Sequence, residues 1–258
     1  MKSNLIPLMK IKMLLVILLG IGPLALPAGL QAKDEEPATA EAIKFTCATW
    51  DTLPNPELFY QQSGEYLPVE LAAGQRSQAY PLKGAEVFEL FIRKAAVAGA
   101  AEASNLPAYE KVGVTALPEG AKRMLFLIEA KNEDKGPPLQ LLAMDDSLEI
   151  FPAGSYRFLN RTPDLLRIDF GGATHDIPPS ELKTVTPVLP EAGGFLPVVI
   201  KNEQGLSLFE NRFLAQRTGR ELVIISPPAE GRTELVIKFL SEIIPVSPPN
   251  AKKPTSRN

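Results

Sequence analysis

The chain has 258 residues, a formal net charge of −3, 45% hydrophobic residues, 25 prolines, one cysteine and one histidine. This composition is ordinary for a globular protein and too apolar for a mostly disordered one. It excludes an intrachain disulfide, a cysteine-rich or multi-histidine metal site, and the clustered basic surface that nucleic-acid binding needs. The proline content, about twice the usual share, disfavours long helices.

Residues 1–32 have the three parts of a secretory signal peptide. The first twelve residues carry three lysines and no acid, and an apolar stretch follows. Small residues then precede the charged Lys33, and we expect cleavage after Ala32, with Ala28 as the alternative site. A retained membrane anchor is the other interpretation, but two glycines and two prolines interrupt the apolar stretch. We therefore predict a secreted or periplasmic protein with no stable membrane insertion after cleavage.

Cleavage would leave 24 basic and 30 acidic residues, a net charge of −6. Such an acidic chain is a poor partner for nucleic acid or anionic lipid. Residues 33–42 are polar and predict a flexible leader, and residues 246–258 are rich in proline and predict a disordered tail. The folded part therefore lies between these two segments.

Strand signals dominate this folded part. Two segments alternate apolar with polar residues, as in strands with one buried face: Leu67/Val69/Leu71 and Leu166/Ile168/Phe170. Two continuous apolar runs predict strands buried on both faces: Met124–Ile128 and Leu222–Ile225. Turn residues are dense between the strands. Lys94–Ser104, which is rich in alanine, predicts an inserted loop or a one-turn helix.

Four pairs of these segments match in order, at offsets of 96–99 residues. They are Leu58–Gln62 with Tyr156–Asn160, Leu67/Val69/Leu71 with Leu166/Ile168/Phe170, Arg123–Ile128 with Arg220–Ile225, and Leu139–Leu141 with Leu235–Ile237. We interpret them as a tandem repeat of a unit of about 100 residues, a typical domain size. One larger sandwich with incidental similarity is the alternative.

The predicted fold is all-β, a tandem repeat of two immunoglobulin-like antiparallel β-sandwich domains after a signal peptide. The first domain is expected at residues 43–148 and the second at residues 149–245. About seven short strands per unit, with turns every 8–12 residues, favour this class.

Few residues indicate chemistry. His175 lies beside Asp176, but adjacent side chains in a strand point to opposite faces, and no Gly-x-Ser-x-Gly turn occurs, so we expect a loop histidine. The acids Asp145, Asp146 and Glu149 lack the spacing of a calcium loop and predict a solvated linker cluster, with weak calcium binding as the alternative. Cys47 shares the apolar phase of its segment and predicts a buried, unreactive thiol.

The remaining candidates favour structural roles. Trp50 is expected to anchor the core, and Asn160, which begins a glycosylation sequon, is expected in a turn. Gly171-Gly172 lacks the Gly-Lys-Ser/Thr ending of a phosphate loop. Arg123 and Arg220 occupy equivalent positions of the two units and are expected to cover a sheet edge with charge. We therefore assign no catalytic, cofactor-binding or metal-binding residue and no cofactor.

Three functional hypotheses follow. The first is an exported non-enzymatic binding or structural module of the cell envelope or extracellular space, with an envelope protein as partner. The second is a periplasmic chaperone or secretion factor that lends an edge strand to a client. Two sandwiches after a signal peptide resemble the architecture of periplasmic pilus chaperones, which implies such a role but carries over no residue. The third is a hydrolase that uses two carboxylates.

Overall fold

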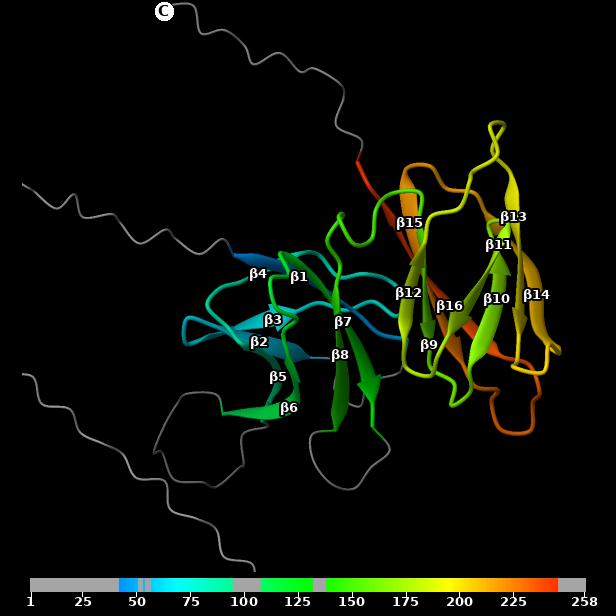
Figure 1. Cartoon of the computed structure of the whole chain (residues 1–258). Coiled ribbons are helices and arrows are strands. Elements are labelled where there is room, and N and C mark those ends of the chain that lie inside the picture. Colours follow the sequence, from blue (N-terminus) through cyan, green and yellow to red (C-terminus); the bar gives the residue numbers. More distant parts are fainter. Residues whose placement is uncertain (1–41, 51–52, 54–56, 95–107, 132–137, 246–258) are drawn as a thin grey trace, which may run out of the picture. The chain divides into compact units, whose positions relative to one another are not determined.

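The computed structural model describes residues 42–50, 53, 57–94, 108–131 and 138–245. These ranges form sixteen β-strands and no helix, so the all-β prediction is confirmed (Figure 1). No membrane-spanning helix is found in the same ranges. The signal peptide, the tail, and all but one residue each of the leader and the Lys94–Ser104 insertion lie outside the described residues.

The first eight strands form a sandwich of two four-stranded sheets. One sheet has the order β4-β1-β7-β8, and the other has the order β3-β2-β5-β6. The apolar side chains of alternating positions fill the space between them. The strands are β1 (Ile43–Ala48), β2 (Leu58–Gln62), β3 (Glu65–Val69), β4 (Tyr80–Leu82), β5 (Val87–Arg93), β6 (Tyr109–Ala116), β7 (Arg123–Ala130) and β8 (Leu139–Asp145).

The last eight strands form a second sandwich with the same strand order. Its sheets are β12-β9-β15-β16 and β11-β10-β13-β14. Its strands are β9 (Tyr156–Asn160), β10 (Leu166–Phe170), β11 (Ala173–Ile177), β12 (Leu182–Val185), β13 (Phe195–Lys201), β14 (Ser207–Leu214), β15 (Gly219–Ser226) and β16 (Val236–Ile243). Each strand of the first sandwich therefore has a counterpart eight places later.

The correspondence extends to local geometry. The strand pairs β1–β7 and β9–β15 are parallel, whereas the other pairs are antiparallel. Strands β6 and β14 each contain a bulge: Val112 is the extra residue opposite Leu90/Phe91, and Leu208 is the extra residue opposite Ile200/Lys201. The β2–β3 and β10–β11 hairpins turn through two residues with positive φ, Ser63-Gly64 and Gly171-Gly172. Such turns match the twist of the flanking strands.

Two of the four segment matches join equivalent strands, and two do not. The matches of β7 with β15 and of β8 with β16 agree with the strand order. Leu58–Gln62 is β2, however, whereas Tyr156–Asn160 is β9, the counterpart of β1. Likewise Leu67 and Val69 lie in β3, whereas their match is β10, the counterpart of β2, so both matches are wrong. The links between strands differ in length in the two halves, and a constant offset therefore pairs neighbouring strands.

The strand order is compatible with a tandem repeat. Both the repeat and the immunoglobulin-like assignment remain interpretations. Each sandwich has eight strands in the described chain, whereas an immunoglobulin constant domain has seven. The domain bounds 43–148 and 149–245 also stay a prediction. Strands β1–β8 end before residue 148, and β9–β16 begin after it.

Each sandwich has its own apolar core. In the first, Phe88 stacks on Phe126 with ring centroids 3.9 Å apart, and Phe45 packs edge-on against Phe88 at 4.8 Å. In the second, Tyr156 and Phe170 pack edge to face at 4.8 Å. Such aromatic pairs stabilise a core by more than their buried area alone.

A third core joins the two sandwiches. The sheets β4-β1-β7-β8 and β12-β9-β15-β16, here called the inner sheets, supply its residues. The strand registers place these residues in matching pairs: Ala48 with Leu159, Leu125 with Leu222, Leu127 with Ile224, and Met144 with Leu240. The two inner sheets therefore pack through the same faces, as the subunits of a symmetric dimer do.

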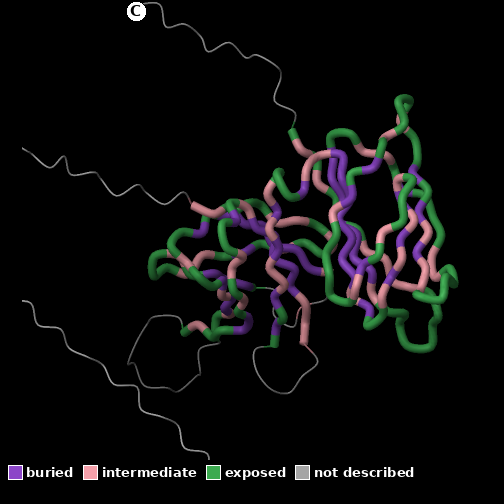
Figure 2. Tube along the Cα trace, in the orientation of Figure 1, coloured by how far each residue is buried: buried purple, intermediate pink, exposed green. Residues whose placement is uncertain are grey.

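This third core explains the two apolar runs. Met124 and Phe126 point into the core of the first sandwich, whereas Leu125 points into the core between the inner sheets. The prediction that both runs are buried on both faces is confirmed, and β7 and β15 stand out as buried strands (Figure 2). Burying one leucine side chain contributes about 1.5–3 kcal/mol, so this contact holds the two sandwiches together.

Candidate functional site: the arginine–carboxylate junction

A cluster of arginines and carboxylates lies beside the core between the inner sheets. Arg123 begins β7, and Arg220 lies near the start of β15 in the equivalent position. Arg220 is the register partner of Glu242 on β16. Asp146 holds the matching place after β8, where its N–H donates to the Arg123 carbonyl oxygen at 2.8 Å. Each half thus supplies one arginine and one carboxylate.

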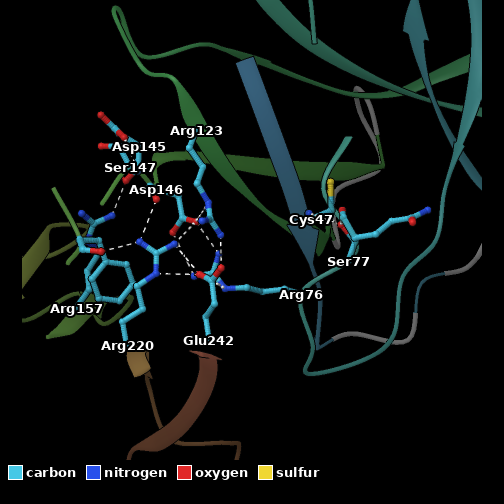
Figure 3. Close-up of polar contacts among 12 residues, drawn as sticks. Cys47, Arg76, Ser77, Arg123, Asp145, Asp146, Ser147, Arg157, Arg220 and Glu242 are labelled. Atoms are coloured by element: carbon cyan, nitrogen blue, oxygen red, sulfur yellow. Dashed lines mark hydrogen bonds and ion pairs between the residues drawn. The ribbon is translucent and has the colours of Figure 1, made fainter. Parts of the chain in front are cut away.

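The side chains of the two halves interlock at this junction (Figure 3). Arg220 Nη2 lies 2.7 Å from Asp146 Oδ2 and 2.6 Å from Glu242 Oε2. Arg123 Nε lies 3.2 Å from the same Asp146 oxygen, and Arg123 Nη2 contacts Glu242. Arg76, from the loop between β3 and β4, places its Nη1 at 2.8 Å from Asp146 Oδ2. Asp146 is only 1% exposed, so these three positively charged partners take the place of water around its carboxylate.

Further hydrogen bonds satisfy the buried charges. Arg220 Nη1 donates to the carbonyl oxygens of Asp146 at 3.0 Å and Phe151 at 2.6 Å. Burial lowers the pKa of Arg220, and the neighbouring carboxylates oppose that effect. Burial would raise the pKa of Glu242, but the charge of Arg76 and the hydrogen bonds from Arg220 and Arg123 hold it below its ordinary value. Glu242 is therefore ionised at neutral pH.

Phe151 fills the second half's side of the junction. Its ring contacts two guanidinium groups, with the Cζ atoms of Arg157 and Arg220 each 4.6 Å from the ring centroid. Arg157 donates to the Asp145 carbonyl oxygen at 2.6 Å and to Thr184 Oγ1 at 2.9 Å, which are both neutral groups. Burial lowers the pKa of Arg157 to about 10. Arg157 thus adds a positive charge without a carboxylate bonded to it.

A cavity of about 620 Å³ lies on the first half's side of the junction. Thr46 is 5% exposed, and its Oγ1 has no hydrogen-bond partner among the residues that the structure describes. Arg76 Nε is buried and lies 3.5 Å from Glu242 Oε2, an ion pair too long for a good hydrogen bond. The walls include a hydroxyl group, two guanidinium groups, one carboxylate and two apolar side chains: Thr46, Arg76, Arg123, Glu242, Phe239 and Ile243.

The acidic cluster expected from the sequence is not a solvated linker cluster. Asp146 is buried in the ion pairs described above, whereas Glu149 is exposed. Asp145 ends β8, and its Oδ1 accepts the Ser147 N–H at 2.8 Å. No group of three or more metal-binding side chains occurs in the described ranges. The expectation was wrong for Asp146 because the arginines of both halves cover its side chain, although Glu149 in the same segment is exposed.

The expectations for two other residues are settled. Cys47 is fully buried, and burial strongly raises the pKa of its thiol, so the prediction of a buried thiol is confirmed. His175 lies in strand β11 and not in a loop, so that detail is wrong. Its Nε2 contacts the Phe170 carbonyl oxygen at 3.2 Å, and Asp176 instead pairs with Arg167. His175 and Asp176 therefore do not form a catalytic pair.

The structural candidates also have defined places. Asn160 is fully buried at the end of β9, where its Nδ2 donates to two carbonyl oxygens at 2.8 and 2.9 Å, so it cannot accept a glycan in the folded chain. Trp50 packs against the core between the inner sheets. Arg123 and Arg220 lie on strands inside their sheets, so the expectation that they cover a sheet edge is wrong. Their equivalent positions are confirmed.

Arg76, Glu242 and Thr46 were not singled out by the sequence. Arg76 lies in a polar loop, and Glu242 lies near the end of the last strand, so neither belongs to a recognisable motif. The one usable signal was the equivalence of Arg123 and Arg220, whose strand partners are Asp146 and Glu242. No protein-family model and no curated protein sequence matches the chain.

Proposed function

We propose that the chain is an exported, non-enzymatic binding or structural module of the cell envelope or extracellular space, with an envelope protein as its partner. The observation that carries this proposal is that the two carboxylates which meet at the junction are both bonded to arginine. Asp146 and Glu242 converge from the two halves, as the carboxylates of a hydrolase do, but both bond to the same Arg220 nitrogen.

A glycoside hydrolase needs one of two carboxyls to stay protonated as a general acid, so that group has a raised pKa. Burial would raise the pKa of Glu242, but Arg76, Arg220 and Arg123 hold it below its ordinary value. Asp146 is almost fully covered and has three positive partners. This arrangement supports a structural use of the two acids and argues against the hydrolase hypothesis.

The packing of the two sandwiches supports a binding role. The matched apolar pairs of the third core make the inner sheets one continuous apolar contact. A pair of sandwiches fixed in this way can present loops and cavities in a preformed arrangement, which lowers the entropy lost on binding. The single histidine and single cysteine are both held in structural contacts.

Two of the edge strands favour this role over the lending of a strand. A lent strand requires a long, regular edge with free backbone groups. Strands β6 and β14, at the edges of the two outer sheets, each contain a bulge, opposite Leu90/Phe91 and Ile200/Lys201 respectively. Both strands also carry charged side chains, among them Lys111 and Arg212. Such features hinder pairing with another chain.

The test begins with expression of the full chain in a bacterial host. We expect the exported fraction to contain a protein whose intact mass corresponds to an N-terminus at Lys33. That protein, immobilised and incubated with an envelope fraction at low salt, should retain a partner that excess soluble chain displaces. The proposal fails if the protein stays in the cytosolic fraction, or if nothing retained from the envelope is displaced by soluble chain.

A further inference from the structure

The contacts of Phe151 with the arginines of the junction indicate which kind of ligand could bind at the equivalent place in the first half. On the second half's side, the Phe151 ring contacts the Arg157 and Arg220 guanidinium groups, and the Phe151 carbonyl oxygen accepts a hydrogen bond from Arg220 Nη1 at 2.6 Å. Phe151 thus supplies both an aromatic ring and an oxygen acceptor to the arginines on this side of the junction. A guanidinium group is attracted to the face of an aromatic ring, and the attraction is stronger where water is excluded.

The cavity on the first half's side occupies the corresponding place. Three of its wall residues match the surroundings of Phe151 by strand register: Arg123 corresponds to Arg220, Glu242 to Asp146, and Thr46 to Arg157. The replacement of arginine by threonine makes room. The β3–β4 loop, which is longer than the β11–β12 loop, brings Arg76 into the wall. Phe239 and Ile243 add apolar surface.

Some hydrogen-bond donors at this cavity have no acceptor. Thr46 Oγ1 and Arg76 Nε are buried without a hydrogen-bond partner in the part of the chain that the structure describes. In the same part, Arg123 donates only to carboxylates, whereas its counterpart Arg220 also donates to two carbonyl oxygens. A buried polar group without a partner costs free energy, so these donors favour a ligand that brings oxygen acceptors.

The charges favour an anionic acceptor. Three guanidinium groups share two carboxylates at the junction, and Arg157 adds a fourth buried guanidinium that bonds to neutral groups. A carboxylate would reduce this excess and form charge-assisted hydrogen bonds, which are about twice as strong as neutral ones. The volume of about 620 Å³ lies within the range of small-ligand sites.

We propose that the cavity lined by Thr46, Arg76 and Arg123 binds an aromatic carboxylate. The ring lies against the Arg123 guanidinium and Phe239, as the Phe151 ring lies against Arg220, and the carboxylate accepts from Arg76 and Thr46. The ligand is a free aromatic acid or the C-terminal residue of a peptide, which share this chemistry. The inference rests on the proposed binding function and assigns a ligand class to it.

The test is an NMR titration of the full chain at neutral pH. The probes are N-acetyl-L-phenylalanine, its uncharged amide, 3-phenylpropanoate and acetate, each up to about 10 mM. We expect the aromatic acids to shift resonances of the cavity residues and to bind at least about tenfold more tightly than the amide or acetate. Tighter binding of N-acetyl-L-phenylalanine indicates a peptide C-terminus, and tighter binding of 3-phenylpropanoate indicates a free acid. Equal binding of acid and amide, or no shift with either acid, overturns the proposal.

Two matched substitutions locate the site. Ile243 is 78% exposed in the cavity wall, so Ile243→Asp adds a repelling charge without disturbing the core. Val188 is 88% exposed between β12 and β13 and takes the same substitution as a control. We expect Ile243→Asp to abolish binding and Val188→Asp to preserve it. Thr46→Val, which keeps the side-chain shape, should weaken binding several-fold.

The outcomes separate this inference from the proposed function. If Ile243→Asp binds the acids as tightly as the unchanged chain, the assigned cavity is wrong. Loss of acid binding in all arms, with displaceable retention of an envelope partner intact, removes the ligand assignment and leaves the binding role. Binding of the acids without any envelope partner supports the cavity and contradicts the wider proposal.

Discussion

Among isosteric substitutions at the junction, we expect Asp146→Asn to lower the free energy of unfolding most. The substitution keeps the side-chain shape but removes the negative charge that faces Arg220 at 2.7 Å, Arg76 at 2.8 Å and Arg123 at 3.2 Å. Arg220 is fully buried and would keep Glu242 as its one carboxylate. Removing one partner of a buried ion pair costs about 3–5 kcal/mol because the remaining charge stays buried.

We expect the free energy of unfolding to fall by about this amount, 3–5 kcal/mol, and Tm to fall by about 6–20 °C for a chain of this size. Urea denaturation at neutral pH measures the loss, with Trp50 fluorescence as the probe of the contact between the inner sheets and far-ultraviolet circular dichroism as the probe of all strands. Because the third core couples the two sandwiches, both probes should report the same midpoint.

Asp145→Asn is the matched control. Asp145 is adjacent, is only partly buried, and accepts one hydrogen bond from the Ser147 N–H. Its substitution should cost about 1 kcal/mol or less. If Asp146→Asn costs under about 1 kcal/mol, or no more than the control, the junction does not stabilise the fold through charge and the reasoning fails.

Three further predictions follow from individual groups. Burial raises the pKa of Cys47, so a thiol reagent should label it only after unfolding, and rapid labelling of the native chain would contradict its placement. The pKa of Glu242 is depressed although burial opposes this, so it contributes stability above about pH 4.3 that is lost as the pH falls through its folded value. Glu242→Gln should flatten that acid limb of a stability–pH curve, and an unchanged slope would refute the assignment. Gly64 and Gly171 both have positive φ, but a Cβ on Gly171 would lie 2.7 Å from Pro187 Cβ. Gly64→Ala should therefore cost about 1–2 kcal/mol and Gly171→Ala at least about 1 kcal/mol more, measured by urea denaturation.

Local patterns predicted the strands well, because alternation and apolar runs depend on neighbouring residues. The run Met124–Ile128 indicated burial on both faces, and the structure supplies a core on each side of it. The same patterns could not align the repeat. Leu58–Gln62 and Tyr156–Asn160 are both short apolar strands, and their true positions depend on link lengths and on the pairing of β9 with β15.

The candidate site was predictable only in part. Arg123 and Arg220 could be recognised as equivalent because each precedes a long apolar run. Their partners could not be found, because Asp146 and Glu242 reach them through strand register and through the packing of one inner sheet on the other. Arg76 lies far from these residues along the chain, in a loop without a distinctive pattern.

Patterns along the chain were sufficient to predict the class of secondary structure, the strands that are buried on both faces and the buried state of Cys47. These properties follow from the order of apolar and polar side chains along a short segment. What covers the second face of β7 and β15, which charges meet at the junction and where a cavity forms beside them became known from the folded structure. Each of these depends on contacts between residues that are distant in the chain, and such contacts are set by strand pairing and by the packing of whole sheets.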